Sequence, residues 1–216
     1  MLFNLSDQPS IANQFISELR DFRLQKDSMR FRRNLERIGE ILAYEISKKL
    51  KYKTIKVETQ LGVAEVEVPA EQIVLATILR AGLPMHYGML SFFDQAANAF
   101  ISAYRMHHKD GSFEIRLEYL SAPDLNDKVL ILCDPMLATG SSIDLTLREL
   151  RRFGTPVKVH IATVIASTYG IQFLQRTHPD ADIWMGALDE ELTAKSYIVP
   201  GLGDAGDLAF GSKEEE

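Results

Sequence analysis

The chain is organised around one stretch in its middle, Val129-Leu130-Ile131-Leu132-Cys133-Asp134-Pro135-Met136-Leu137-Ala138-Thr139-Gly140-Ser141-Ser142-Ile143. Its apolar first part is too short for a core helix and is typical of a strand buried on both faces. Leucines at helical spacing follow the loop and predict a helix, for which Ser141 and Ser142 are suitable N-cap residues. The stretch therefore predicts a strand, a loop and a helix, with the loop where open α/β sheets bind ligands.

The loop has the composition of an anion-binding site. Thr139 to Ser142 can direct several backbone N–H groups and three hydroxyls toward one phosphate at the amino end of a helix. Each hydrogen bond to a charged oxygen contributes about 1.5–3 kcal/mol, more than the helix dipole does at an exposed site. Asp134 repels a phosphate, but its carboxylate can accept hydrogen bonds from sugar hydroxyls. The pattern indicates a ribose phosphate, with an ordinary capped strand–turn–helix junction as the alternative.

The composition is that of one globular domain: 216 residues, of which 46% are hydrophobic and 25% charged. The net charge of −6 argues against a nucleic-acid partner, which needs a basic face. No run approaches the roughly 20 apolar residues of a membrane helix, so we expect no membrane partner. Because Cys133 is the only cysteine, no internal disulfide is possible, and we expect a cytoplasmic location.

The N-terminal part is predicted to precede the main sheet. Residues 1–10 are polar and are predicted to be a loop. Apolar positions at helical spacing predict helices from Ser10 to about Leu24 and from Phe31 to Ile46. Alternation between Thr54 and Val68 predicts a hairpin. We expect residues 1–70 to form a small cap of helices and hairpin.

From residue 71 onward, short apolar runs alternate with helical segments, which predicts an α/β fold with a mostly parallel central sheet flanked by helices. The run Ile73 to Leu79 is one such strand. Arg80 follows it and can hold a diphosphate with its planar guanidinium, although a surface arginine would look the same. Residues from about 105 to 122 predict a two-stranded flap with one apolar side. The whole chain, residues 1–216, is expected to be a single domain with its core at 71–216.

Three blocks resemble the uracil phosphoribosyltransferase family. Asp134 to Ser142 resembles the family's motif for phosphoribosyl pyrophosphate (PRPP). Ile78 to Leu83 is similar to its diphosphate-side loop, and Tyr197 to Asp207 to its uracil-binding segment. The blocks keep the family's order, and weaker similarity extends over nearly the whole chain from about Phe31. The predicted flap also resembles the mobile flap with which phosphoribosyltransferases cover their site.

The C-terminal block also satisfies the dinucleotide pattern Gly-x-Gly-x-x-Gly, from Gly201 to Gly206. Too few residues follow for the helix, second strand and acidic residue that dinucleotide binding requires, so we reject that interpretation. A glycine-rich loop lets the backbone approach a flat ligand closely. Uracil presents two carbonyls and an N–H along one edge, which backbone groups can read without side chains.

The resemblance implies a reaction and a set of site residues. The reaction transfers the 5-phosphoribosyl group of PRPP to N1 of uracil and gives UMP and diphosphate. The implied catalytic residues are Asp134, Arg105 and Asp204. The implied PRPP contacts are Arg80, Arg105, Asp134, Pro135, Met136, Leu137, Ala138, Thr139, Gly140, Ser141, Ser142 and Asp204, and the implied uracil contacts are Ile198, Gly203, Asp204 and Ala205.

The same resemblance implies a cofactor and partners. Mg²⁺ is expected to be carried mainly by the oxygens of PRPP, with no dedicated metal site, and Asp204 is expected to help orient either the Mg²⁺–diphosphate shell or the base. A homo-oligomer, either a dimer or a tetramer, is expected. The resemblance leaves open whether GTP is an effector.

Two other functions stay open. A phosphoribosyltransferase for a purine or for orotate would need a roomier pocket or an added cation near residues 198–205, and the sequence shows neither. A regulator that binds UMP and RNA would need a basic RNA-binding face, against which the net charge of −6 argues.

Overall fold

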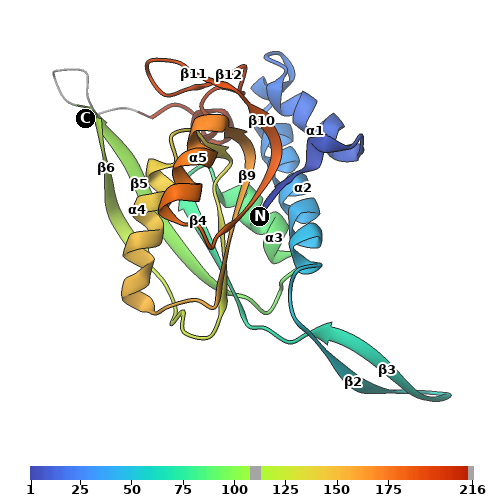
Figure 1. Ribbon diagram of the computed structural model, residues 1–216. Coiled ribbons are helices and arrows are strands. Elements are labelled where there is room, and N and C mark those ends of the chain that lie inside the picture. Colours follow the sequence, from blue (N-terminus) through green and yellow to red (C-terminus); the bar gives the residue numbers. More distant parts are fainter. Residues whose placement is uncertain (108–112, 214–216) are drawn as a thin grey trace.

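The computed structural model describes residues 1–107 and 113–213, and it contains one main sheet between two layers of helices (Figure 1). The strands follow one another across this sheet in the order β1-β10-β9-β7-β4-β5-β6, with β8 beside β9. All neighbours are parallel except β5 and β6. The strands are β1 (Leu2–Asn4), β4 (Ile73–Leu79), β5 (Ala97–His107), β6 (Phe113–Ser121), β7 (Val129–Cys133), β8 (Met136–Leu137), β9 (Lys158–Ser167) and β10 (Asp182–Asp189).

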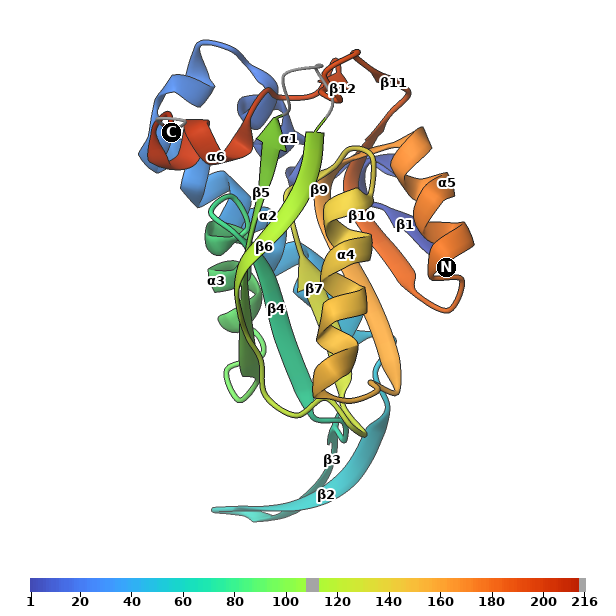
Figure 2. The same cartoon turned by 90° about the vertical axis from the view of Figure 1, so that its left-hand side faces the viewer.

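Helices cover both faces of the sheet, with α2 and α3 on one side and α4 and α5 on the other (Figure 2). The helices are α1 (Ile11–Arg20), α2 (Ser28–Ser47), α3 (Leu83–Leu90), α4 (Ser141–Leu150), α5 (Thr168–Thr177) and α6 (Ala205–Phe210), with 3-10 turns at η1 (Leu5–Asp7), η2 (Leu24–Lys26) and η3 (Arg151–Phe153). The predicted α/β class is therefore confirmed, and β4 and β7 have the predicted bounds. Within the described residues, no helix is both long and apolar enough to span a membrane.

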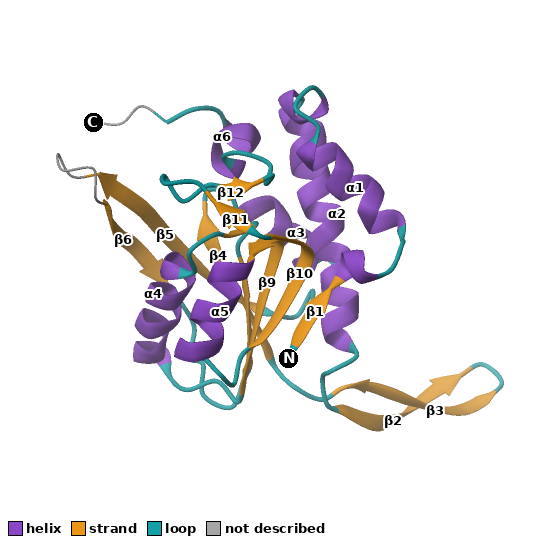
Figure 3. Cartoon of the chain, turned by 45° about the horizontal axis from the view of Figure 1, so that its top comes forward, coloured by secondary structure: helices purple, strands orange, loops and turns teal. Residues whose placement is uncertain are grey.

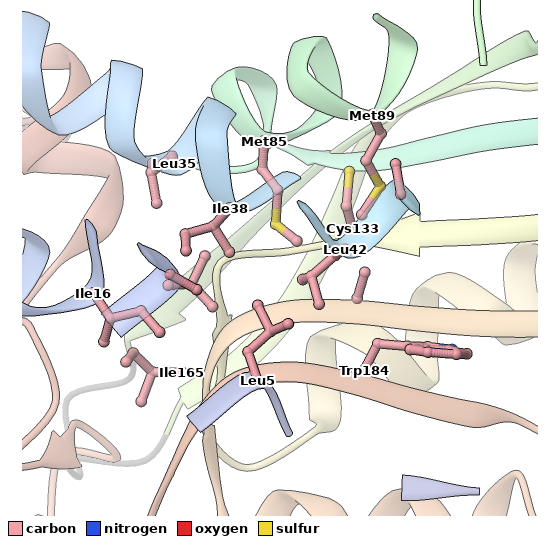
Figure 4. Close-up of a cluster of buried hydrophobic side chains, with 14 of the residues drawn as sticks. Leu5, Ile16, Leu35, Ile38, Leu42, Met85, Met89, Cys133, Ile165 and Trp184 are labelled. Atoms are coloured by element: carbon pink, nitrogen blue, oxygen red, sulfur yellow. The ribbon is translucent and has the colours of Figure 1, made fainter. Parts of the chain in front are cut away.

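Two hydrophobic clusters form because neighbouring residues of a strand point to opposite faces. Along β7, Ile131 and Cys133 join the cluster under α1, α2 and α3, whereas Leu130 and Leu132 join the cluster under α4 and α5. Figure 4 shows Cys133 in the first cluster with side chains from α2, α3 and β10. A strand that feeds two cores must be apolar at every position, which explains the continuous apolar run.

The N-terminal residues differ from the prediction. Residues 1–10 were predicted to be a loop, but β1 pairs in parallel with β10 at the edge of the main sheet. The rings of Phe3 and Trp184 lie 5.0 Å apart across this pairing. A strand of three residues leaves almost no periodic signal, and it forms because a distant strand offers it a partner.

The two predicted N-terminal helices form, and they lie over one face of the sheet (Figure 2). The predicted hairpin also forms, as β2 (Tyr52–Thr59) and β3 (Gly62–Pro69). It projects away from the body of the molecule (Figure 3). The assignment of residues 1–70 to a separate cap and of residues 71–216 to a core stays a prediction.

The predicted flap is continuous with the main sheet. Strand β5 runs from Ala97 to His107, into the predicted flap, and β6 returns along it from Phe113. The pairing reaches back to Phe100 opposite Ser121. The hairpin is thus an extension of the sheet's edge, and its predicted turn, residues 108–112, lies outside the described residues.

Two buried histidines are held in their neutral form. His160 accepts a hydrogen bond at Nδ1 from Trp184 Nε1 at 3.1 Å. His86 lies against the ring of Phe100, at 5.2 Å between centroids, and its ring nitrogens have no hydrogen-bond partner in the described part of the chain. Burial lowers the pKa of both side chains to about 4, because it penalises the charged form.

We expect His86→Leu to reduce the acid sensitivity of the fold. In the unfolded chain, His86 binds a proton below about pH 6.5. In the folded chain it stays neutral down to about pH 4, so the free energy of unfolding decreases as the pH is lowered between these two values. Between pH 7.5 and pH 5 the wild type should lose about 2 kcal/mol more than the variant. Urea unfolding at both pH values measures this difference, and equal losses in the two proteins would contradict it.

Candidate active site

The three sequence blocks meet at one end of the sheet. Strands β4 and β7 are parallel neighbours, so the loops that follow them leave the same edge. A Cβ atom on Gly82 would lie 3.0 Å from the carbonyl oxygen of Cys133, which shows how closely the two loops approach. A Cβ atom on Gly206 would lie 3.9 Å from Nη2 of Arg80, so the C-terminal block joins them. The position agrees with the ligand sites of open α/β sheets.

The predicted phosphate loop begins where β7 ends. Asp134 is half-buried there, and its Oδ1 atom lies 3.5 Å from the backbone nitrogen of Met136. The loop then touches β9, because Leu137 N–H donates to Thr163 Oγ1 at 3.1 Å. Thr139 Oγ1 donates to Ser141 Oγ at 3.0 Å and accepts from Ser141 N–H at 3.3 Å. The hydroxyls of the loop are thereby brought to the amino end of α4.

The prediction that Ser141 and Ser142 cap the helix is wrong. The cap is Gly140, which has a left-handed backbone at φ +83°, and Ser141 is already the first helical residue. Gly140 has no side chain with which to cap this end, and the Ser141 N–H donates to Thr139 Oγ1. The left-handed conformation suits glycine, and it turns the chain into the helix before either serine. The remaining first-turn N–H groups suit an anion at this helix end.

Helix α5 supports the phosphate loop from behind. Ser167, its N-cap, donates from Oγ to the carbonyl oxygen of Ala138, and Gly170 N–H donates to the same Oγ at 2.9 Å. A Cβ atom on Gly140 would lie 2.9 Å from a ring carbon of Phe173. The loop is therefore packed tightly against α5 and is fixed before any ligand arrives.

A buried acid joins α4 to the far end of α5. Asp144 in the first turn of α4 lies 2.9 Å from both His178 Nε2 and Arg148 Nη2. No local pattern in the sequence indicates this contact, because a strand separates the two helices. It fixes the direction in which α4 leaves the loop.

Arg80 lies between the β4 loop and the C-terminal block. Its Nη2 atom donates to Asp207 Oδ1 at 3.1 Å and to the carbonyl oxygen of Gly211 at 3.0 Å. Asp204 is the N-cap of α6, and its Oδ1 atom accepts from Asp207 N–H at 3.0 Å. Arg80, Asp204 and Asp207 thus form one charged group. The backbone of Arg105 lies in β5 opposite Ile115, and its side chain is outside the described residues.

The C-terminal block runs from β12 (Ile198–Val199), which pairs with β11 (Glu191–Leu192), to α6. The side chains of Ile198 and Ala205, two predicted uracil contacts, are 5% and 3% exposed and belong to the hydrophobic core. They cannot reach into a pocket, so only their backbone is available to a ligand. Gly203 is exposed, with φ +95°. The segment can therefore present backbone N–H and C=O groups to a flat base.

Taken together, a helix-terminal anion loop, an acid at the end of the strand and an arginine opposite define a protein that binds a phosphorylated sugar. Comparison with known proteins narrows this class. The family described as "Uracil phosphoribosyltransferase" matches residues 5–212, so the chain belongs to the uracil phosphoribosyltransferase family.

Individual relatives agree over almost the whole chain. A protein of Porphyromonas gingivalis named uracil phosphoribosyltransferase is 51% identical, over 98% of this chain and 99% of that protein. One of Pyrococcus furiosus with the same name is 36% identical, over 97% and 90%. A solved structure of an Aquifex aeolicus protein is 30% identical and superposes with a TM-score of 0.87, covering 98% of both chains.

We expect Gly140→Ala to weaken the binding of PRPP. The added methyl group would meet Phe173, and the left-handed backbone would be strained, so the loop should shift by a few tenths of an ångström. Steady-state kinetics should show KM for PRPP raised about tenfold, with KM for uracil changed less.

Gly154→Ala is the matched control for this change. Gly154 also has a positive φ, +123°, and its Cβ atom would lie 2.8 Å from Asn126, far from the loop. It should lower the melting temperature without changing KM for PRPP. An equal rise of KM in both variants would mean that Gly140 contributes only to stability.

Proposed function

We propose that this chain transfers the 5-phosphoribosyl group of PRPP to N1 of uracil, which gives UMP and diphosphate. The convergence of three segments at one end of the sheet carries this proposal. The loop of residues 134–142, the Arg80 loop and the segment of residues 198–205 each suit a different part of the two substrates. Family membership supports the same reaction.

The phosphoribosyl half of the site is proposed as follows. First-turn N–H groups of α4 and the hydroxyls of Thr139, Ser141 and Ser142 bind the 5-phosphate. Backbone groups of Pro135, Met136, Leu137, Ala138 and Gly140 complete the loop around it. The carboxylate of Asp134, where β7 ends, accepts hydrogen bonds from the ribose hydroxyls. Because α5 supports the loop, little ordering is left to occur on binding.

The opposite side of the site is proposed to stabilise the leaving group. As diphosphate departs from C1′, negative charge grows on its oxygens and positive charge on the ribose ring. Arg80, whose side chain is 38% exposed, can hold the diphosphate with its guanidinium, and Arg105 is proposed to do the same from β5. Asp134 is proposed as the catalytic group on the ribose side, and Asp204 as the catalytic group beside the diphosphate.

A covalent intermediate on cysteine is not part of this mechanism. Cys133 is fully buried beside the loop, and burial raises the pKa of its thiol to about 12, so almost no thiolate is present at neutral pH. The proposed catalysis rests instead on positioning the two substrates and on balancing charge at C1′.

Magnesium would be held largely by the substrate. Among the described residues no group of three or more acidic, histidine or cysteine side chains could hold a metal ion. Asp204 is half-buried beside Arg80, and one carboxylate with substrate oxygens and waters suits Mg²⁺. When bound with PRPP, the ion would offset charge on the diphosphate, and Asp204 would orient its shell.

Uracil is proposed to be read by the backbone of residues 198–205. The burial of Ile198 and Ala205 leaves main-chain groups as the contacts there, and Gly203 allows a close approach. A base with an extra carboxylate, such as orotate, would need a cation near this segment that is free to pair with it; residues 198–205 contain none, and Arg20, which contacts Gly201, is paired with Asp189. This favours uracil over orotate.

A homo-oligomer is also proposed, on the evidence of the projecting hairpin. Ile55 opposes Val66 and Val57 opposes Ala64, so one face of the hairpin is apolar. Val57 and Val66 are 39% and 42% exposed. Two-stranded hairpins are marginal in water unless a surface covers them. A second copy of the chain is the proposed cover.

Three expectations from the sequence stay proposals. GTP is proposed as an effector only by resemblance. A cytoplasmic location is proposed on the buried, unpaired thiol of Cys133. Closure of the β5–β6 extension over the substrates is proposed because the site must exclude water from the glycosyl cation.

The proposed reaction predicts a narrow base preference. Purified protein with Mg²⁺ and PRPP should form UMP from uracil, and should turn over orotate, hypoxanthine and adenine at least about 100-fold more slowly. An absorbance or radiolabel assay with each base measures this preference. Faster turnover of another base would mean that residues 198–205 do not select uracil. Binding of UMP and RNA without turnover would favour a regulator.

The proposed oligomer predicts that a charge on the apolar face of the hairpin disrupts it. Val57→Lys should lower the mass measured by light scattering toward the 24.3 kDa of one chain. Thr54→Lys is the matched control, because Thr54 opposes Glu67 on the other face. It adds the same charge and should leave the mass unchanged. Equal masses for the two variants would contradict this use of the hairpin.

A further inference from the structure

A buried ion pair holds the turn in the middle of the C-terminal block. Arg20, the last residue of α1, donates from Nη1 to Asp189 Oδ2 at 2.7 Å and from Nη2 to Oδ1 at 2.8 Å. Asp189 ends β10 and is 6% exposed, and Arg20 is 23% exposed. The two hydrogen bonds are parallel, which is the most directional arrangement of these two groups.

The same pair captures both backbone groups of Gly201. Gly201 N–H donates to Asp189 Oδ2 at 2.8 Å, and its carbonyl oxygen accepts from Arg20 Nη1 at 3.0 Å. Gly201 has φ +56°, and a Cβ atom there would collide with the carbonyl oxygen of Ile198. Gly201 itself therefore offers no side chain for packing, although its neighbour Leu202 is 4% exposed and belongs to the hydrophobic core. The backbone of Gly201 is held by these two contacts with the ion pair.

This turn lies between the residues proposed to read the base. Ile198 precedes it, and Gly203 and Ala205 follow it. We propose that Arg20 and Asp189 are positioning residues for uracil, which fix the backbone of residues 198–205 in its base-reading geometry without touching the base. This inference rests on the proposed function of that segment.

Stability alone is a weak reason for such a pair. Buried ion pairs often contribute little net stability, because removing both charges from water costs about as much as their attraction returns. Backbone recognition of a base, in contrast, tolerates only small displacements, and a shift near 1 Å can cost about 100-fold in rate. A rigid clamp is therefore most useful at Gly201, where the backbone has to be held at a residue that has no side chain of its own.

Helix α1 carries a matched control. Glu18 accepts from Arg30 Nη2 at 2.7 Å and from Asn34 Nδ2 at 2.7 Å, and it is 7% exposed. The Arg30 guanidinium beside it lowers the pKa of the Glu18 carboxyl to about 2. These contacts join α1 to α2. Substitution of Glu18 therefore measures what a buried ion pair contributes to the stability of the fold alone.

The test compares Asp189→Asn with Glu18→Gln in the full-length enzyme. Asp189→Asn keeps the volume but removes the charge that holds Arg20, so Gly201 should lose its fixed position. We expect KM for uracil to rise about tenfold or more, while KM for PRPP changes less than about twofold. Glu18→Gln should lower the melting temperature and leave both KM values unchanged.

A second variant keeps the inference testable if Asp189→Asn does not fold. Arg20→Lys retains the charge but loses the planar fork, so it should raise KM for uracil in the same selective way. A rise shared by Glu18→Gln, or equal rises of both KM values, would overturn the inference. Failure of the wild type to use uracil would instead overturn the proposed function, so the two failures are distinguishable.

Discussion

The site depends on the parallel pairing of β4 and β7. Cys133, the last residue of β7, lies opposite Thr77 in this pairing, and β4 continues to Leu79, so the two strands release their loops at the same edge of the sheet. Gly82 is the point of closest approach, where any side chain would meet Thr77 Oγ1, Ile78 and Cys133. If the register slipped by one residue, each strand would turn its side chains to the wrong core. The two hydrophobic clusters thus fix where the loops begin.

Around this pairing, each buried acid near the site is matched by specific donors. Asp144 joins α4 to α5 through Arg148 and His178, and Asp189 joins β10, α1 and the C-terminal turn through Arg20. Such contacts restrict motion more than they add net stability. They leave the phosphate loop and the C-terminal turn with fixed backbones. Substrates would therefore bind to groups that are already in position. In a reaction without a covalent nucleophile, such positioning is the main source of rate acceleration.

Local patterns in the sequence were sufficient for the elements that hold the substrates. The continuous apolar run of β7 and the stripe of α2 set those elements, and the small residues after Asp134 marked the loop. What the sequence could not show depends on distant partners. β1 exists because β10 is there to pair with it, and Arg20 meets Asp189 across 169 residues. The cap of α4 was misassigned because serine is the commoner N-cap, whereas the turn here requires the positive φ of Gly140.

The two ends of UMP, its phosphoribosyl group and its base, are proposed to bind to two backbone segments, the phosphate loop and the C-terminal turn, which are supported by different contacts. Calorimetric titration of UMP, ribose 5-phosphate and uracil into the wild type, Gly140→Ala and Asp189→Asn tests this proposal most directly. We expect weaker binding of UMP by both variants, weaker binding of ribose 5-phosphate by Gly140→Ala alone, and weaker binding of uracil by Asp189→Asn alone. Weaker binding of ribose 5-phosphate by both variants, weaker binding of uracil by both variants, or no binding of UMP to the wild type would contradict it.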